Sequence, residues 1–71
     1  MELLDIGYGN SINADKIIAV VSAEAAPVKR LVFAAKEKNL LVDATCGKKT
    51  KSVYVMESGH IVLSARDGGG S

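Results

Sequence analysis

The sequence predicts an α+β fold, in which a small antiparallel β-sheet of about five short strands packs against one amphipathic helix. Apolar residues recur with helical spacing over residues 28–35, and short β-branched and apolar runs elsewhere are bounded by Gly, Asn, Asp and Ser. The chain has 71 residues, which is the size of one domain. We therefore expect a single domain over residues 1–66 and a disordered, glycine-rich tail over residues 67–71, which an artificial linker would also explain.

The first two predicted strands differ in their expected surroundings. Residues 3–6 form a short strand that ends at GYGN, where Gly7 and Gly9 allow backbone angles that other residues resist. The run IIAVV, residues 17–21, is apolar on both of its alternating faces. That pattern is typical of a strand covered on both sides, which is unusual in so small a domain.

The predicted helix has recognisable start and stop signals. Pro27 suits its first position, because the missing N–H would have no intrahelical partner there. Asn39 is expected to end the helix, because Asn tolerates the left-handed backbone conformation common at helix ends. Between them lies one apolar stripe, formed by Val28, Leu31, Val32 and Ala35. We assign Pro27 and this stripe to folding rather than to ligand binding.

Three further strands are predicted over residues 40–45, 51–56 and 60–65, which read LLVDAT, KSVYVM and HIVLSA. The connections CGKK and ESG between them are short and contain Gly, as β-hairpin loops do. These strands are therefore expected to form an antiparallel meander with the helix on one face.

The other face of this sheet is expected to need a neighbouring subunit. One helix of about three turns cannot cover both faces, and a domain of this size gains only about 3–5 kcal/mol from its core. Phe33 lies about 140° from Val28 around the helix, on its polar side, where it is either a tolerated surface aromatic or a subunit contact. The apolar residues expected on the uncovered face are Ile18, Val20, Tyr54, Met56 and Val62. We predict a homo-oligomer that uses Ile18, Val20 and Phe33 as contacts.

The positive charge of the chain is concentrated in its middle. The formal net charge is only +1, but residues 28–51 contain seven basic and two acidic residues, a net charge of +5. Lys48, Lys49 and Lys51 follow one another closely in CGKKTK. This segment is either a solvated loop tip whose lysines discourage edge-to-edge aggregation of sheets, or a contact for a polyanion.

Several other functions find little support in the sequence. GKKT lacks the glycine and the Ser or Thr that a phosphate-binding P-loop requires. Cys46 beside lysines could have a reactive thiolate, but one cysteine and one distant histidine, His60, make neither a persuasive catalytic pair nor a zinc site. No apolar run approaches the roughly 20 residues that span a bilayer. We expect a soluble, cytoplasmic protein that is not an enzyme and uses no cofactor, metal, membrane or small-molecule substrate.

Several motifs together resemble the RemA family of bacterial extracellular matrix regulators. They are GYGN, the helix start AAPVKR, LVDAT followed by Gly and two basic residues, and VYVM followed by GHIVLSA. The resemblance covers residues 4–65, nearly the whole chain. It implies a small DNA-binding transcription regulator of matrix and biofilm genes that assembles into a ring, with double-stranded DNA along the basic outer surface.

The resemblance also implies which residues bind DNA. The basic pair of the family falls on Lys48 and Lys49, and its basic residue ahead of the second strand falls on Lys16; Lys51 is a secondary candidate. The family favours arginine at the first three positions. Lysine lacks the bidentate fork that reads guanine, so phosphate binding is expected here rather than base recognition.

A function without DNA remains open at this point. The alternative is a structural self-assembly or protein-interaction module whose partner is another polypeptide. The two differ in salt dependence, because only phosphate binding weakens steeply as salt rises.

Overall fold

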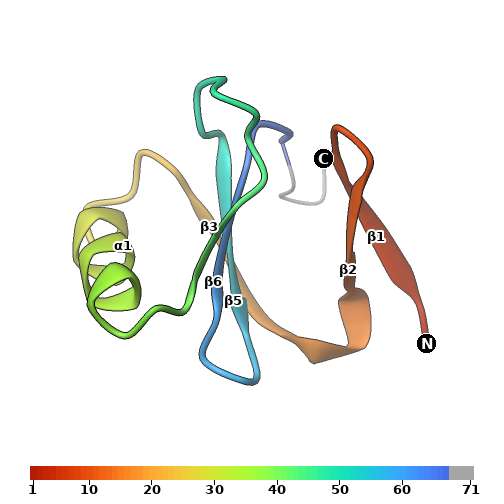
Figure 1. The fold of residues 1–71 in the computed structure, drawn as a ribbon, viewed down its shortest axis with the longest axis horizontal. Coiled ribbons are helices and arrows are strands. Elements are labelled where there is room, and N and C mark those ends of the chain that lie inside the picture. The colour runs from red at the N-terminus through yellow and green to blue at the C-terminus, as the bar shows by residue number, and fades with distance from the viewer. Residues whose placement is uncertain (68–71) are drawn as a thin grey trace.

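The computed structural model describes residues 1–67, arranged as Figure 1 shows. Its elements are β1 (Leu3–Gly7), β2 (Asn10–Asn13), a 3-10 turn (Ala14–Lys16), β3 (Ile17–Ser22), α1 (Val28–Glu37), β4 (Leu41–Asp43), β5 (Ser52–Met56) and β6 (Ile61–Ser64). The α+β class is confirmed, with one α-helix and six strands in the described residues. Of the tail predicted over residues 67–71, residues 68–71 lie outside the described residues.

The elements form three layers. A four-stranded sheet lies in the middle, α1 covers one of its faces, and the β1–β2 hairpin lies on the other side (Figure 1). The order of strands in the central sheet is β3–β5–β6–β4. Strands β3 and β4 are therefore its two edges.

The predicted meander is wrong at one pair of strands. Strand β4 pairs with β6, and it does so in parallel, with Leu41 opposite Ile61 and Asp43 opposite Leu63. The chain between β4 and β5, residues 44–51, is therefore not a hairpin loop but a connection that passes the end of β6. It is longer than the short loop CGKK that was predicted between them, and β5 itself completes the crossover that parallel strands need. The predicted hairpin between β5 and β6 is confirmed.

Strand β2 and its hairpin with β1 were not predicted. Leu4 pairs with Ile12 across the hairpin, and the turn contains three consecutive positive φ angles, at Gly7, Tyr8 and Gly9. Strand β2 reads NSIN, and Ile12 is its only apolar residue. Such a short polar segment has no alternating pattern by which a strand can be recognised.

The hairpin corrects the prediction that one face of the sheet needs a neighbouring subunit. Tyr54, Met56 and Val62 are buried in one apolar cluster with Ile6 of β1, and Leu4 and Ile12 pack against it. Tyr54 is only 1% exposed. A second cluster lies between the sheet and α1 and contains Val28, Ala35, Val53 and Ile61. Both faces of the central strands are thus covered within one chain.

Strand β1 is also tied to the end of the chain. The buried hydroxyl of Ser64 donates a hydrogen bond of 2.9 Å to the carbonyl of Ile6, across 58 residues of sequence. Arg66 forms an ion pair with Asp5 at 3.5 Å. The hairpin therefore depends on β6 for its position.

The edge strand β3 is not covered on both sides, contrary to prediction. Its residues alternate between half-buried and exposed, and Ile18 and Val20 are 66% and 41% exposed. Val20 pairs with Tyr54, but the β1–β2 hairpin that helps to bury Tyr54 leaves Val20 exposed. Phe33 of α1 is also exposed, at 65%. These three side chains keep the surface position that a subunit contact requires, and the contact itself stays a prediction.

Helix α1 agrees closely with the sequence. Val28 and Ala35 are buried, and Pro27 occupies the N-cap position, one residue earlier than predicted. The helix ends in a Schellman motif, in which the N–H of Leu40 donates to the carbonyl of Ala35 at 2.8 Å and Asn39 has a positive φ of 59°. The predicted role of Asn39 is confirmed.

Replacing Asn39 by Ala is expected to lower the free energy of unfolding by about 1 kcal/mol, because a Cβ without a compensating side-chain hydrogen bond is disfavoured at positive φ. Asn39→Gly is the matched control and is expected to leave stability unchanged or raise it, because Gly adopts this conformation freely. Urea denaturation followed by circular dichroism measures both. Equal losses in the two variants would show that the side chain of Asn39, rather than its backbone angle, stabilises the helix end.

Candidate nucleic-acid interface

The structure brings three of the four predicted DNA-binding lysines together. Lys48, Lys49 and Lys51 lie on the connection between β4 and β5, residues 44–51, which we call the lysine loop. All three residues are exposed. The loop extends from one end of the central sheet (top of Figure 1).

The lysine loop is anchored at both of its ends. Ala44 and Thr45 are buried, and the N–H of Ala44 donates to the carbonyl of Leu63 at 3.0 Å. At the other end, the N–H of Lys51 donates to the carbonyl of Ser64 at 2.8 Å. Both anchors are thus on β6, so the loop is held across the end of this strand.

A tight turn forms the tip of the loop. The N–H of Lys48 donates to the carbonyl of Thr45 at 2.9 Å. The two residues between them, Cys46 and Gly47, have positive φ angles of 52° and 79°, the signs that a type I′ turn requires. Lys48 and Lys49 follow this turn directly, so their backbone positions are well defined.

Asp43 fixes the start of the loop through a capping interaction. The hydroxyl and the N–H of Thr45 both donate to Oδ1 of Asp43, at 2.7 and 2.9 Å. The hydrogen bond from the Thr45 hydroxyl lowers the pKa of Asp43 most, followed by the bond from the Thr45 N–H. Burial opposes both, and the charge of Lys36 makes the smallest contribution, which also lowers the pKa. The carboxylate is therefore held in its ionised form.

The lysines of the loop carry unneutralised charge. In the part of the chain that the structure describes, the ion pairs shorter than 4.0 Å are Lys16–Glu57 and Arg66–Asp5. Neither involves a lysine of the loop. Three ammonium groups on one anchored loop can therefore bind phosphate oxygens without first breaking an ion pair.

Lys16 lies apart from this group. Its ammonium pairs with Glu57 at 3.7 Å, and its carbonyl accepts a hydrogen bond from the Glu57 N–H at 2.7 Å. The six residue steps from Lys51 to Glu57 along β5 correspond to roughly 20 Å of extended chain. Within one subunit, Lys16 and the lysine loop are at opposite ends of the sheet.

Two acidic residues near the loop were not foreseen. Glu24 and Asp67 line a hollow of about 270 Å³ together with Lys49 and Lys51. The pairing of Ser22 with Ser52 brings the chain around Glu24 to the loop. The spacing of residues in the sequence gives no sign of this approach. The two carboxylates reduce the positive potential on that side of the loop.

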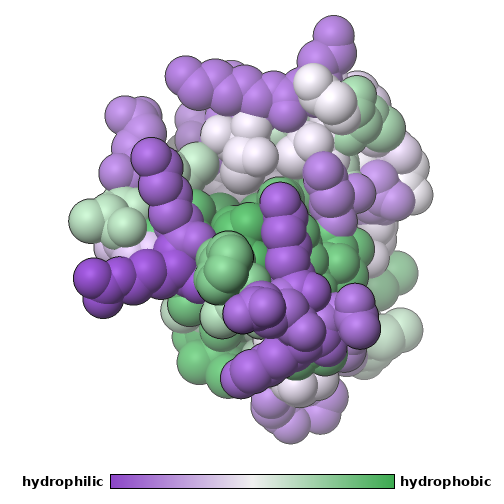
Figure 2. Space-filling view, turned by 60° about the vertical axis from the view of Figure 1, so that its left-hand side comes forward, coloured by the Kyte–Doolittle hydropathy of each residue, from purple (hydrophilic) through white to green (hydrophobic). Residues whose placement is uncertain are grey.

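Three further basic residues lie on α1, at Lys29, Arg30 and Lys36, and Lys38 directly follows the helix; all are exposed. In the view of Figure 2, hydrophilic side chains surround an apolar area of the surface. The excess of positive charge predicted for residues 28–51 therefore lies on two separate elements, the lysine loop and α1.

The candidate metal-binding and nucleophilic side chains lie apart in the described residues. No group of three or more His, Cys, Asp or Glu side chains that could hold a metal ion occurs among residues 1–67. Cys46 is exposed in the lysine loop, whereas His60 lies in the β5–β6 turn at the other end of the sheet, hydrogen-bonded to the Ser58 hydroxyl at 2.6 Å. Within that same range, no helix is long and apolar enough to cross a membrane.

The structure defines a small α+β domain with three lysines on an anchored loop. The chain is a member of the RemA-like family, described as extracellular matrix regulatory protein A-like, whose profile matches residues 3–67. The family resemblance of the sequence motifs is thereby confirmed.

The chain is also similar to individual proteins. It is 61% identical over 64 residues to a protein of Lachnoclostridium phytofermentans, a match that covers 90% of this chain and 70% of the relative. It is 58% identical to proteins of Bacillus cytotoxicus and Bacillus mycoides, with 90% of this chain and 74% of each relative covered. All three are named provisionally as regulatory proteins. The names of these relatives therefore indicate a regulatory role for those proteins.

Replacing Thr45 by Val is expected to destabilise the protein by about 1 kcal/mol at pH 7, less than the usual contribution of a hydrogen bond to a charged group, because Asp43 is solvent-exposed. The pKa of Asp43 is lower in the folded than in the unfolded protein. Its ionised carboxylate therefore stabilises the fold above the unfolded pKa of about 3.9, and this stabilisation is lost as the pH falls through the folded pKa. The difference between the two proteins should therefore shrink from pH 6 to pH 2. Thr50→Val is the control within the loop. If the two proteins still differed as much in stability at pH 2, the hydrogen bond from Thr45 to the ionised Asp43 would not be the cause.

Proposed function

We propose that this protein is a DNA-binding transcription regulator that contacts the phosphates of double-stranded DNA through the lysine loop. Lys48 and Lys49 make the principal contacts, and Lys51 a secondary one. The observation that carries the proposal is the anchored loop with three lysines unpaired by any described carboxylate. The regulatory names of its relatives support it. As a regulator of matrix and biofilm genes, the protein acts in the bacterial cytoplasm, where its DNA is.

The chemistry of lysine determines the kind of recognition. An ammonium group is a point charge that binds a phosphate oxygen well but lacks the planar fork that reads the edge of guanine. Each phosphate neutralised contributes about −0.9 to the slope of log affinity against log salt concentration. Sequence preference then comes from how easily the duplex bends rather than from contacts to bases.

A single subunit binds DNA weakly, because three phosphate contacts give only non-specific affinity, typically about 10⁻⁴–10⁻⁶ M at physiological salt. Repetition of the lysine loop around a homo-oligomeric ring adds the contacts of several subunits along one duplex. In such a ring, Lys16 of one subunit reaches the same duplex as the lysine loop of the next. This arrangement overcomes the separation of the two sites within a subunit.

The exposed apolar residues support assembly of this kind. Ile18 and Val20 are on the edge strand β3, and Phe33 is on α1. If the β3 surface of one subunit binds the α1 surface of the next without the reciprocal contact, the interface is heterologous. Heterologous contacts that close produce rings, and those that do not close produce filaments.

A self-assembly or protein-interaction module without DNA binding is the second candidate function. The same exposed apolar residues, Ile18, Val20 and Phe33, favour it. Glu24 and Asp67 beside Lys49 and Lys51 also favour it, because they oppose the approach of phosphate from that side. This function predicts little binding of DNA at any salt concentration.

The double substitution Lys48→Ala/Lys49→Ala is expected to abolish most DNA binding at physiological salt and to flatten the salt slope by about 1.8 for each subunit that touches the duplex. Fluorescence anisotropy of a labelled duplex over a salt series measures both quantities. Light scattering with and without DNA should show an unchanged assembly size in the variant.

Lys29→Ala/Lys36→Ala removes the same charge from α1 and is the control. This control variant should keep most of the slope of log affinity against log salt concentration. Equal losses in the two variants would assign binding to net charge rather than to the lysine loop. Retained binding in the loop variant would favour the function without DNA.

A further inference from the structure

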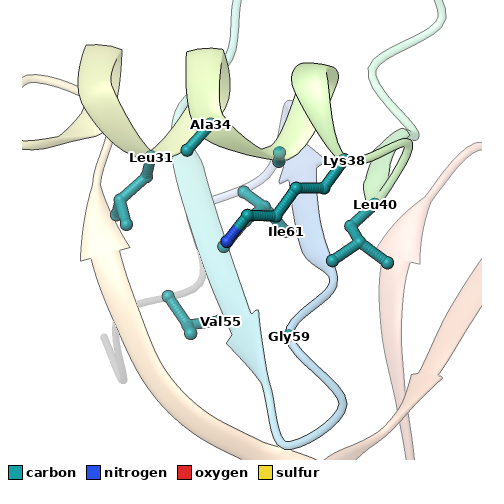
Figure 3. A pocket seen from close by; sticks show the side chains of 8 residues that line it. Leu31, Ala34, Lys38, Leu40, Val55, Gly59 and Ile61 are labelled. Atoms are coloured by element: carbon teal, nitrogen blue, oxygen red, sulfur yellow. The ribbon is translucent and has the colours of Figure 1, made fainter.

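An apolar hollow lies between α1 and the β5–β6 hairpin (Figure 3). Its volume is about 270 Å³, and its walls include Leu31, Ala34, Leu40, Val55 and Ile61. It is at the end of the sheet that carries the β5–β6 turn, opposite the lysine loop. Any ligand there is therefore separate from the proposed DNA contact.

The hollow exists because small residues meet where a helix and a hairpin approach each other. Ala34 offers only a methyl group from α1, and Gly59 in the hairpin turn offers no side chain. The Schellman motif turns the chain after Asn39, so that Leu40 forms the end wall. Gly59 and Leu40 lie close together at this end, because a Cβ added at Gly59 would be in van der Waals contact with Cδ1 of Leu40, at 3.6 Å.

Lys38 is the one charged residue that lines the hollow. Its side chain extends across the hollow, with the ammonium group at the end away from the helix terminus (Figure 3). Among residues 1–67 this ammonium has no carboxylate within 4.0 Å. The hollow thus combines aliphatic walls with a single cation that lacks a counterion in the described chain.

We propose that this hollow is a binding site for a short aliphatic carboxylate, whose chain lies against Leu31, Val55 and Ile61 and whose carboxylate pairs with Lys38. Pockets for drug-sized ligands measure about 300–1,000 Å³, so a volume of about 270 Å³ suits a ligand smaller than these, such as a single acyl chain. An aliphatic tail and an anionic head match the two chemical features of the site. The site does not depend on DNA binding.

A second copy of the chain fits the hollow less well. Phe33 is the most exposed apolar side chain on α1 and the obvious candidate for insertion. Lys29 and Lys36 flank it and line the same surface depression. Inserting Phe33 of one copy beside Lys38 of another would bring like charges together, which is unfavourable at an interface. A small anion has no such cost.

The test is a series of carboxylates from butyrate to decanoate, titrated into the full chain below their micelle concentrations. Binding is measured by calorimetry and by NMR shifts of the methyl groups of Leu31, Val55 and Ile61. Each added methylene is expected to tighten binding about fourfold until the hollow is full, after which affinity levels off. The matching alcohols should bind about tenfold more weakly, because they lack the charge-assisted bond to Lys38.

Variants locate the site within the fold. Ala34→Leu fills the hollow from an exposed helix position, where Leu is a good helix former, and should abolish binding of octanoate. Lys38→Ala should reduce octanoate affinity about tenfold and leave octanol affinity unchanged. Lys36→Ala removes a neighbouring charge that does not line the hollow and should change neither.

Three outcomes would overturn the proposal. One is the absence of binding by any member of the series at millimolar concentration. Another is affinity that rises with chain length without levelling off and is insensitive to Ala34→Leu, which would indicate non-specific adsorption. The third is equal affinity for octanoate and octanol, which would show that the ammonium of Lys38 merely covers apolar surface.

Discussion

The central sheet is apolar on both faces, and both must be removed from water by a chain of 71 residues. Adjacent residues of β5 point to opposite sides, so that Val53 packs toward α1 and Tyr54 toward the β1–β2 hairpin. Each fully buried large side chain contributes about 1.5–3 kcal/mol. Neither layer alone would suffice, because removing either would expose one complete face of the sheet. The three-layer arrangement follows from this requirement.

The position of the lysine loop is a consequence of the strand order. Because β4 pairs with β6 rather than with β5, the chain must pass the end of β6 before it can form the next strand. The hydrogen bonds to Leu63 and Ser64 fix this passage at both ends. A cluster of positive charge is therefore carried outward by an element whose backbone is held by the sheet. The same strand order leaves β3 at an edge, with its apolar residues uncovered.

Much of this structure could be predicted, because the signals concerned are local. The apolar stripe of α1 and the left-handed Asn39 depend on a few neighbouring residues, and the lysines of CGKKTK are exposed as their charge requires. Strand β2 was missed because Asn10 and Ser11 carry no apolar pattern. The parallel pairing of β4 could not be predicted, since the alternation of apolar residues is the same beside a parallel or an antiparallel neighbour. The separation of Lys16 from the loop follows from the antiparallel pairing of β3 with β5, which the sequence does not encode locally.

The hydrogen bond between Ser64 and Ile6 has a consequence for the synthesis of the protein. The two residues are 58 positions apart, so the first strand leaves the ribosome long before its partner is made. At about 5–20 residues per second, that interval is roughly 3 to 12 s. Until β5 and β6 have been made, the apolar side of the nascent hairpin lacks Tyr54, Met56 and Val62, against which it packs in the folded domain. The domain can therefore complete its fold only after β6 has been made, and a message truncated before β6 would yield a chain that lacks Ile61 and Val62 in its two apolar clusters.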